Sequence, residues 1–242
     1  MTFRMRRFLI VLLALAGVAT FVFANPESYE QVSTRLENIG GSEALAGDEE
    51  ILVPTGGATL ASEGLELLEV KGRAPKTGYS REEFYNGWPT VDGCNLRQKI
   101  IKREFGDSAV LDGCNVISGE YDEPYTGKHL VFSSRDEISK GIQIDHVVAL
   151  SDAWQKGAQY MDKDTRYKIA TDPLNLLAVD AVANGKKSDG DAATWLPFNK
   201  GFRCAYVARQ VSVKYKYGLW VTAAEKEAIA GILATCPDEP ML

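Results

Sequence analysis

The adjacent residues Asp145 and His146 are the side chains of this sequence best suited to chemistry. They interrupt the mostly apolar segment 142–150, in a chain that has only 2 histidines. Burying an ionisable pair costs free energy, so we expect the pair to have a polar partner or a metal ion. A neutral imidazole can take a proton from water, and a carboxylate can hold a cation. A structural Asp-His pair would also explain the dipeptide alone, so its interpretation depends on its neighbours.

Polar residues in later segments supply those neighbours. Asn175 lies in the short run 172–177, which we expect to be a strand, and its amide could pin a neighbouring loop through two donors and an acceptor. Asn184 follows with Lys186 and Lys187, so that one turn or short helix could offer an oxygen ligand and a cation to the same phosphate. Mg²⁺ prefers a few oxygen ligands and keeps several waters. Asp145 and Asn184 suit that preference.

The elements that must position these residues are predicted by periodicity and turn residues. Three short strands separated by Gly and Pro turns are expected at residues 115–118, 130–132 and 142–145. Helices are expected at residues 95–105 and 201–217, and a further one after the capping box TAAE at 222–225. This order of elements indicates an α+β fold. Because consecutive strand residues point to opposite faces, Asp145 and His146 can share one site only if the strand ends in a turn there.

The 4 cysteines, Cys94, Cys114, Cys204 and Cys236, show no C-x-x-C spacing, which disfavours a zinc site. An even number of cysteines in an exported chain is typical of disulfides. Three pairings are possible. We expect Cys94 to pair with Cys114 and Cys204 with Cys236, because each pairing closes a short local loop and contributes about 3 kcal/mol.

The first 24 residues indicate export. Three arginines precede the uncharged, mostly apolar run 8–23, which is the outline of a signal peptide cleaved after Ala24. An uncleaved membrane anchor formed by residues 8–23 stays open as an alternative. Both versions place the rest of the chain outside the cytoplasm, as a secreted or membrane-anchored protein.

Composition divides the remainder of the chain in two. Residues 25–72 are rich in Glu, Gly, Ala and Ser and predict an acidic flexible linker, and residues 73–242 predict one folded domain. The linker accounts for the net charge of -6, since residues 71–242 hold as many basic as acidic side chains. The segment 192–224 has no acidic residue and contains Lys200, Arg203, Arg209, Lys214 and Lys216. We expect these residues to form a diffuse basic patch that contacts nucleic-acid backbones without sequence preference.

Several motifs in this order resemble those of a known superfamily. The series IDHVVAL, NLLAV and NGKKSD resembles the HNH endonucleases of ββα-metal fold, and NGKKSD is similar to the corresponding segment of the HNH domains in CRISPR effector nucleases. With YSREEFYNGW, DEPYTGK, NGKKSDGDAATWLP and YGLW added, residues 73–236 resemble exported actinobacterial HNH proteins. That family is named for the C-terminal domain of the GmrSD restriction endonucleases.

The resemblance implies a ββα-metal core with flanking helices and two disulfides, and it implies a role for each site residue. Asp145 matches the metal-binding acid, His146 the general base, Asn175 the loop-pinning asparagine, Asn184 the second metal-side position and Lys187 the motif lysine. The last HNH position is Asn instead of His, which favours Mg²⁺ or Mn²⁺ over softer ions.

The function that follows is metal-dependent hydrolysis of phosphodiester bonds in DNA by an exported monomer with little sequence preference, and RNA stays open as a second substrate. A neutral imidazole, with an ordinary pKa of about 6.5, would accept the proton of the attacking water. Two alternatives remain open. One is a catalytically silent extracellular module that binds nucleic acid or the cell envelope, and the other is a secreted hydrolase of a different phosphodiester.

Overall fold

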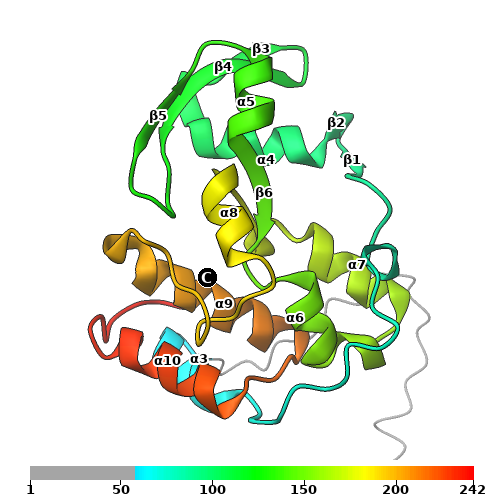
Figure 1. Ribbon diagram of the computed structural model, residues 1–242, viewed down its shortest axis with the longest axis vertical. Helices are drawn as coiled ribbons and strands as arrows, with labels where there is room; N and C mark the ends of the chain where they lie inside the picture. Colours follow the sequence, from blue (N-terminus) through cyan, green and yellow to red (C-terminus); the bar gives the residue numbers. More distant parts are fainter. Residues whose placement is uncertain (1–57) are drawn as a thin grey trace, which may run out of the picture. The chain divides into compact units, whose positions relative to one another are not determined.

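The computed structural model describes residues 58–242 (Figure 1). The expected signal peptide or anchor at residues 1–24, and residues 25–57 of the expected linker, lie outside the described residues. The helices are α3 (Ala61–Leu67), α4 (Leu96–Phe105), α5 (Arg135–Gly141), α6 (Leu150–Gln155), α7 (Lys163–Thr171), α8 (Ala181–Lys187), α9 (Arg203–Tyr217) and α10 (Ala223–Leu233). The strands are β1 (Thr90–Val91), β2 (Cys94–Asn95), β3 (Val110–Asp112), β4 (Asn115–Asp122), β5 (His129–Phe132), β6 (Ile142–His146) and β7 (Leu176–Asp180). This mixture of helices and small sheets confirms the α+β class. Within residues 58–242, no helix is both long enough and apolar enough to cross a membrane.

The hairpin of β6 and β7 together with α8 forms the expected ββα unit. The two strands are antiparallel, with Asp145 opposite Leu177 and His146 opposite Leu176. Helix α8 follows β7 directly, starts at its N-cap Asp180 and lies beside β6 (Figure 1). Helices α6 and α7 occupy the chain between the two strands. The unit therefore brings the end of β6 next to residues more than thirty positions later in the chain.

A second layer supports β6. Strands β3, β4 and β5 form an antiparallel sheet, against which α4 and α5 pack. Helix α4 begins at Leu96, is capped by the side chain of the preceding Asn95, and buries Ile100 and Ile101. Ile142 and Ile144 of β6 belong to the same apolar cluster. Strand β6, which carries Asp145 and His146, is thus held in place by the apolar cluster that it shares with α4 and β4.

Residues 58–72, expected to end the acidic linker, are folded instead. Helix α3 and the residue after it bury Ala61, Leu65 and Leu68 against α9 and α10. The amide of Met241 donates to the carbonyl of Thr59 (2.9 Å), so the C-terminal residues cover this segment. The expectation that the folded domain begins at residue 73 is therefore wrong. Three apolar residues spaced four and three apart make a helical stripe that is too short to stand out in an acidic sequence.

The run 172–177 is a turn followed by a strand, where a strand throughout was expected. Residues Pro173–Asn175 form a 3-10 turn, and β7 starts only at Leu176. Proline cannot donate to a strand ladder, and the Asp172 carboxylate accepts a hydrogen bond from the amide of Leu174 (2.9 Å). Both effects favour a turn at this point.

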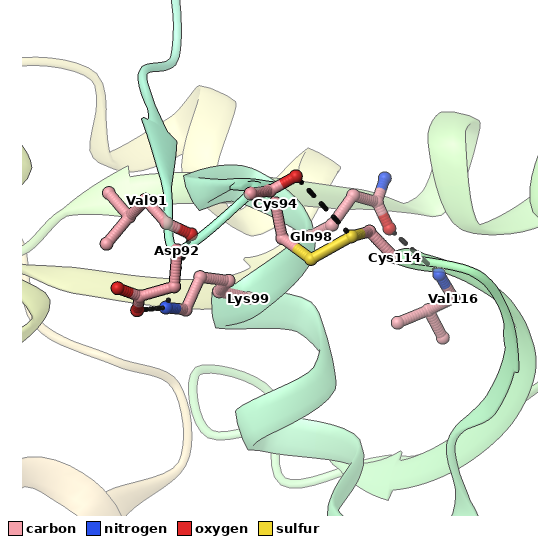
Figure 2. Close-up of a disulfide and its surroundings, with 8 residues drawn as sticks. Val91, Asp92, Cys94, Gln98, Lys99, Cys114 and Val116 are labelled. Atoms are coloured by element: carbon pink, nitrogen blue, oxygen red, sulfur yellow. Dashed lines mark hydrogen bonds and ion pairs between the residues drawn. A yellow bond between two sulfur atoms is a disulfide. The ribbon is translucent and has the colours of Figure 1, made fainter.

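Both expected disulfides are present. Cys94 pairs with Cys114, which joins β2 to the turn between β3 and β4, and Cys204 pairs with Cys236, which joins α9 to the end of α10. Figure 2 shows the first bridge beside α4, where the amide of Val116 donates to the side chain of Gln98 (3.0 Å). Closing loops of this size stabilises a domain by about 3 kcal/mol per bridge.

Candidate active site

Asp145 and His146 lie at the end of β6, and each is only 5% exposed. The His146 ring is stacked with that of Trp88, with centroids 5.8 Å apart, and lies 5.9 Å from that of Tyr85. Its Nε2 atom is 2.9 Å from the carbonyl oxygen of Ala170. A carbonyl oxygen can only accept, so we assign the imidazole proton to Nε2. Nδ1 is then the basic nitrogen.

The surroundings keep His146 neutral. Burial lowers its pKa to about 3, the Ala170 carbonyl opposes this shift, and the positive charges of Arg81 and Lys187 lower the pKa further. The imidazole is therefore uncharged near pH 7, which is the form that can accept a proton.

Asp145 is held by two donors. The hydroxyl of Tyr125 donates to Oδ2 (2.5 Å), and the ammonium of Lys187 donates to Oδ1 (2.9 Å). Burial raises the pKa of Asp145, whereas the Lys187 charge and the Tyr125 hydrogen bond oppose that shift. Tyr125 is itself completely buried, so the carboxylate is held in a single orientation.

Lys187 lies behind the site. Its fully buried ammonium also donates to the backbone carbonyl of His146 (2.9 Å). This corrects the expectation that Lys187 offers its charge to a phosphate. A buried carboxylate without a partner would cost several kcal/mol, and Lys187 supplies that partner. The contact also ties the last turn of α8 to the end of β6.

Asn175 pins the loop that follows the Asp-His pair. Its side chain is completely buried. Its Oδ1 accepts from the amide of Val148 (2.8 Å), and its Nδ2 donates to the carbonyls of Val148 (3.3 Å) and Ile169 (3.0 Å). Both donors of the side-chain amide and its oxygen are thereby engaged by backbone groups. These groups belong to Val148, two residues after His146, and to Ile169, the residue before Ala170, whose carbonyl accepts from His146.

Asp145, His146 and Asn184 line one pocket of about 330 Å³. Asn184 is half-buried, and its Nδ2 donates to the side-chain oxygen of Gln143 (2.8 Å), which leaves its amide oxygen for another partner. The rest of the lining comes from the segment before β1, from the end of β6 through the start of α6, and from the turn after α8: Lys76, Tyr79, Arg81, Ile144, Ala149, Leu150, Ser151, Ser188 and Asp189. The structure thus brings three of the five predicted residues into the pocket and places Lys187 and Asn175 behind it.

The oxygen atoms of this pocket suit a hard divalent cation. Asp145 offers a carboxylate and Asn184 an amide oxygen, and an open pocket admits the waters that Mg²⁺ retains. Within residues 58–242, one group of three His, Cys, Asp or Glu side chains is close enough to share an ion, and it consists of Cys204, Cys236 and Glu239. Its two sulfurs form a disulfide and are not available as thiolate ligands. Asp145 and Asn184 remain the residues that fit the cation.

Sequence reasoning missed several side chains of the site. Tyr125 holds the carboxylate, Trp88 and Tyr85 flank the imidazole, and Arg81 lines the pocket. The motifs DEPYTGK and YSREEFYNGW contain these residues, but nothing in a sequence states which distant partner an aromatic ring will contact.

Three of the five cations of the expected diffuse basic patch are buried or have partners within the protein. Lys214 is completely buried, Lys216 pairs with Asp172 (2.8 Å), and Arg209 is half-buried and donates to the carbonyl of Leu174 (2.8 Å). The absence of acids nearby in the sequence is therefore misleading, because the carboxylates that pair with Lys214 and Lys216 come from other segments.

Lys214 belongs to what we call the buried charge network. Its members come from α6, α9, α10, the residue after α6, the turn after α8 and the segment after α3: Asp152, Lys214, Glu225, Lys156, Asp191 and Arg73. Asp152 Oδ1 and Glu225 Oε1 lie within ion-pair distance of lysines but outside hydrogen-bond geometry, so their stabilisation is mainly Coulombic. The network connects α6, which contributes Leu150 and Ser151 to the pocket lining, with α9 and α10.

Comparison with known proteins identifies the family of this chain. A family model for the C-terminal domain of the GmrSD restriction endonucleases matches residues 96–232. An "Uncharacterized secreted protein" of Arthroderma benhamiae (strain ATCC MYA-4681 / CBS 112371) is 36% identical over 183 residues, which cover 74% of this chain and 86% of the relative. No solved structure matches the chain. With more than half of its length matched by the family model, the chain belongs to the family of GmrSD restriction endonuclease C-terminal domains.

Proposed function

We propose that this protein is an exported, metal-dependent endonuclease of HNH type that hydrolyses the phosphodiester bonds of DNA with little sequence preference. The observation that carries the proposal is the neutral His146, with its proton assigned to Nε2, in the same pocket as the oxygen ligands Asp145 and Asn184. Membership of the family indicates a nuclease-type function. The residues of the pocket suit a phosphate and its metal, which RNA also offers, so RNA is the second substrate to be tested.

In this mechanism Nδ1 of His146 accepts a proton from the water that attacks phosphorus. The P–O bond to one sugar oxygen breaks as the new P–O bond forms, and the departing oxygen takes up a proton from solvent. The hydrogen bond to Ala170 and the stacked ring of Trp88 keep the imidazole in one tautomer and one orientation. A phosphate anion bound beside the ring favours the imidazolium and raises its pKa toward the working pH. Mg²⁺ or Mn²⁺ bound by Asp145 and Asn184 would supply positive charge to the phosphate oxygens. Asn175 keeps the loop after β6 in place during the reaction.

An extracellular location fits three observations. The matched relative is named as a secreted protein. The two disulfides are typical of an oxidising compartment. The basic and then apolar start of the chain would direct export, and residues 1–24 would be either removed or kept as an anchor. The mass of the protein recovered from the medium or the membrane distinguishes the two fates.

A catalytically silent binding module is the second candidate, and one observation favours it. Lys187 already neutralises Asp145, at the place where a nuclease would need the carboxylate for a metal. A domain that only binds would keep this ion pair and take up no cation.

The experiment that separates the two candidates is cleavage of plasmid and linear DNA by the purified exported chain, with Mg²⁺, Mn²⁺ or a chelator. We expect nicking and degradation that require the metal. His146→Ala should lower the cleavage rate by about 10² to 10⁴, whereas His129→Ala is a matched control because His129 is an exposed residue of β5 outside the pocket. Cleavage in the presence of chelator, or none with either metal, would reject the proposal.

A second measurement distinguishes the base from the metal ligands. Asp145→Ala and Asn184→Ala should weaken Mg²⁺ binding measured by calorimetry, and part of their lost rate should return at high metal concentration. His146→Ala should bind Mg²⁺ like the wild type and should not be rescued by metal. Equal loss of affinity in all three variants would mean that His146 is itself a ligand.

A further inference from the structure

The pocket needs a cation that the expected residue does not supply. Negative charge grows on the phosphate oxygens during hydrolysis, and a positioned cation lowers the energy of that transition state. Lys187 is buried against Asp145 and does not line the pocket. Lys76 does line it but is paired with Asp189 (3.0 Å). Both lysines are therefore already neutralised by carboxylates.

Arg81 is the remaining cation of the pocket lining. None of the ion pairs within residues 58–242 includes it. Its guanidinium lies over the ring of Tyr85 (5.1 Å from the centroid), and its Nε (3.1 Å) and Nη2 both donate to the Tyr85 hydroxyl. These contacts use only part of the five donors of a guanidinium, and the side chain is exposed. Arg81 therefore holds uncompensated charge and free donors at the mouth of the pocket.

Tyr85 links the position of Arg81 to that of the base. It is 6% exposed, and its ring lies 5.9 Å from the ring of His146. An arginine held on one aromatic ring loses less conformational freedom when it binds a ligand than a free surface arginine does. A guanidinium also matches the geometry of two phosphate oxygens, which an ammonium cannot do.

We propose that Arg81 binds the scissile phosphate of the nucleic acid and stabilises the charge that develops on it, beside the base His146. This inference rests on the proposed function. It also extends the active site beyond the family domain, since Arg81 precedes the matched residues 96–232. The segment before β1 is then part of the catalytic machinery and more than a connection to the N-terminal region.

The test compares Arg81→Met and Arg81→Lys with Arg135→Met in the exported chain. Arg135 is an exposed arginine at the start of α5, outside the pocket, and its loss changes the net charge equally. We expect Arg81→Met to lower kcat by about 10² to 10³, Arg81→Lys to recover part of that loss, and Arg135→Met to cleave like the wild type. Circular dichroism and thermal unfolding should be unchanged, because the side chain is exposed.

A binding measurement keeps the inference testable apart from cleavage. Affinity for a duplex DNA oligonucleotide is measured with Ca²⁺ in place of Mg²⁺ at several salt concentrations. Losing one phosphate contact should reduce the slope of log K against log salt concentration by about 1 in Arg81→Met. Arg135→Met should keep the wild-type slope.

The outcomes separate this inference from the proposed function. If the wild type cleaves DNA and the kcat of Arg81→Met stays within about threefold of the wild-type value, the role of Arg81 is rejected, whereas the proposed nuclease function is retained. If the wild type does not cleave, the nuclease is rejected, and the binding slopes decide whether Arg81 contacts phosphate. If the wild type does not cleave and Arg81→Met keeps the wild-type slope of log K against log salt concentration, the inference about Arg81 is overturned as well.

Discussion

Replacing Lys156 by Met should strongly destabilise the protein through the buried charge network. The Lys156 ammonium lies 2.7 Å from Asp152, 2.8 Å from Asp191 and 2.7 Å from Glu225, and it is completely buried. Met has a similar volume, so the main change is the loss of one positive charge among three carboxylates. Removing one partner from a buried ion pair costs about 3 to 5 kcal/mol, and we expect a loss of that size at pH 7.

The dependence on pH identifies the cause of this loss. In the wild type the pKa of Asp152 and that of Asp191 are lowered: burial raises both, but the neighbouring lysines and Arg73 outweigh it. Their stabilisation is present above the ordinary carboxyl pKa of about 3.9 and is lost as the pH falls through the lowered values. Without Lys156 a carboxyl of the network should have a raised pKa, and its protonation relieves the excess negative charge. The penalty should therefore shrink between pH 7 and pH 4.5, whereas a packing defect would be independent of pH.

Urea unfolding followed by tryptophan fluorescence, with the disulfides intact, measures this penalty. Lys140→Met is the matched control, because Lys140 pairs with Asp136 (2.6 Å) on the exposed face of α5. Exposed pairs of this kind contribute well under 1 kcal/mol. A loss below about 1 kcal/mol for Lys156→Met at pH 7, or an equal loss at pH 4.5, would refute the assignment of a stabilising buried network.

Three further predictions concern the support of the site. Asn175→Ala should lower the free energy of unfolding by about 2 to 4 kcal/mol and reduce cleavage, because it leaves three buried backbone groups without partners; unchanged stability in urea would contradict the contacts. The pKa of His146 is about 3 in the folded state, below its unfolded value of about 6.5. As the pH falls below about 6.5, the imidazole is therefore protonated in the unfolded state but not in the folded state, which lowers the free energy of unfolding. Between pH 6 and pH 4 the free energy of unfolding should therefore fall by about 2 kcal/mol less in His146→Gln than in the wild type. Parallel curves of unfolding free energy against pH for the two proteins would show that folding does not shift the pKa of His146. Replacing both Cys204 and Cys236 by Ser should lower the unfolding free energy by about 3 kcal/mol, with non-reducing peptide mapping of the wild type as the check on pairing.

Local patterns were sufficient for three of the helices. The amphipathic period of residues 95–105, the Gly after Tyr217 and the capping box at Thr222 predicted helices that the structure confirms. These signals depend on neighbours within a few residues, which a sequence displays directly. Helix α3 was missed because its apolar stripe is completed only by residues of α9 and α10 and by the C-terminal end.

The sequence by itself indicated the α+β class, both disulfide pairings and three residues that share the pocket at the end of β6, which are Asp145, His146 and Asn184. It did so because the turn residues, the cysteine spacing and the order of the motifs are properties of the chain. The tertiary structure decided which charges remain free. Lys187 and Lys214 are as basic in the sequence as Arg81, yet two of the three are neutralised by carboxylates from distant segments. A charge is available to a ligand only if folding leaves it without a partner, and that depends on the packing of helices far apart in the chain.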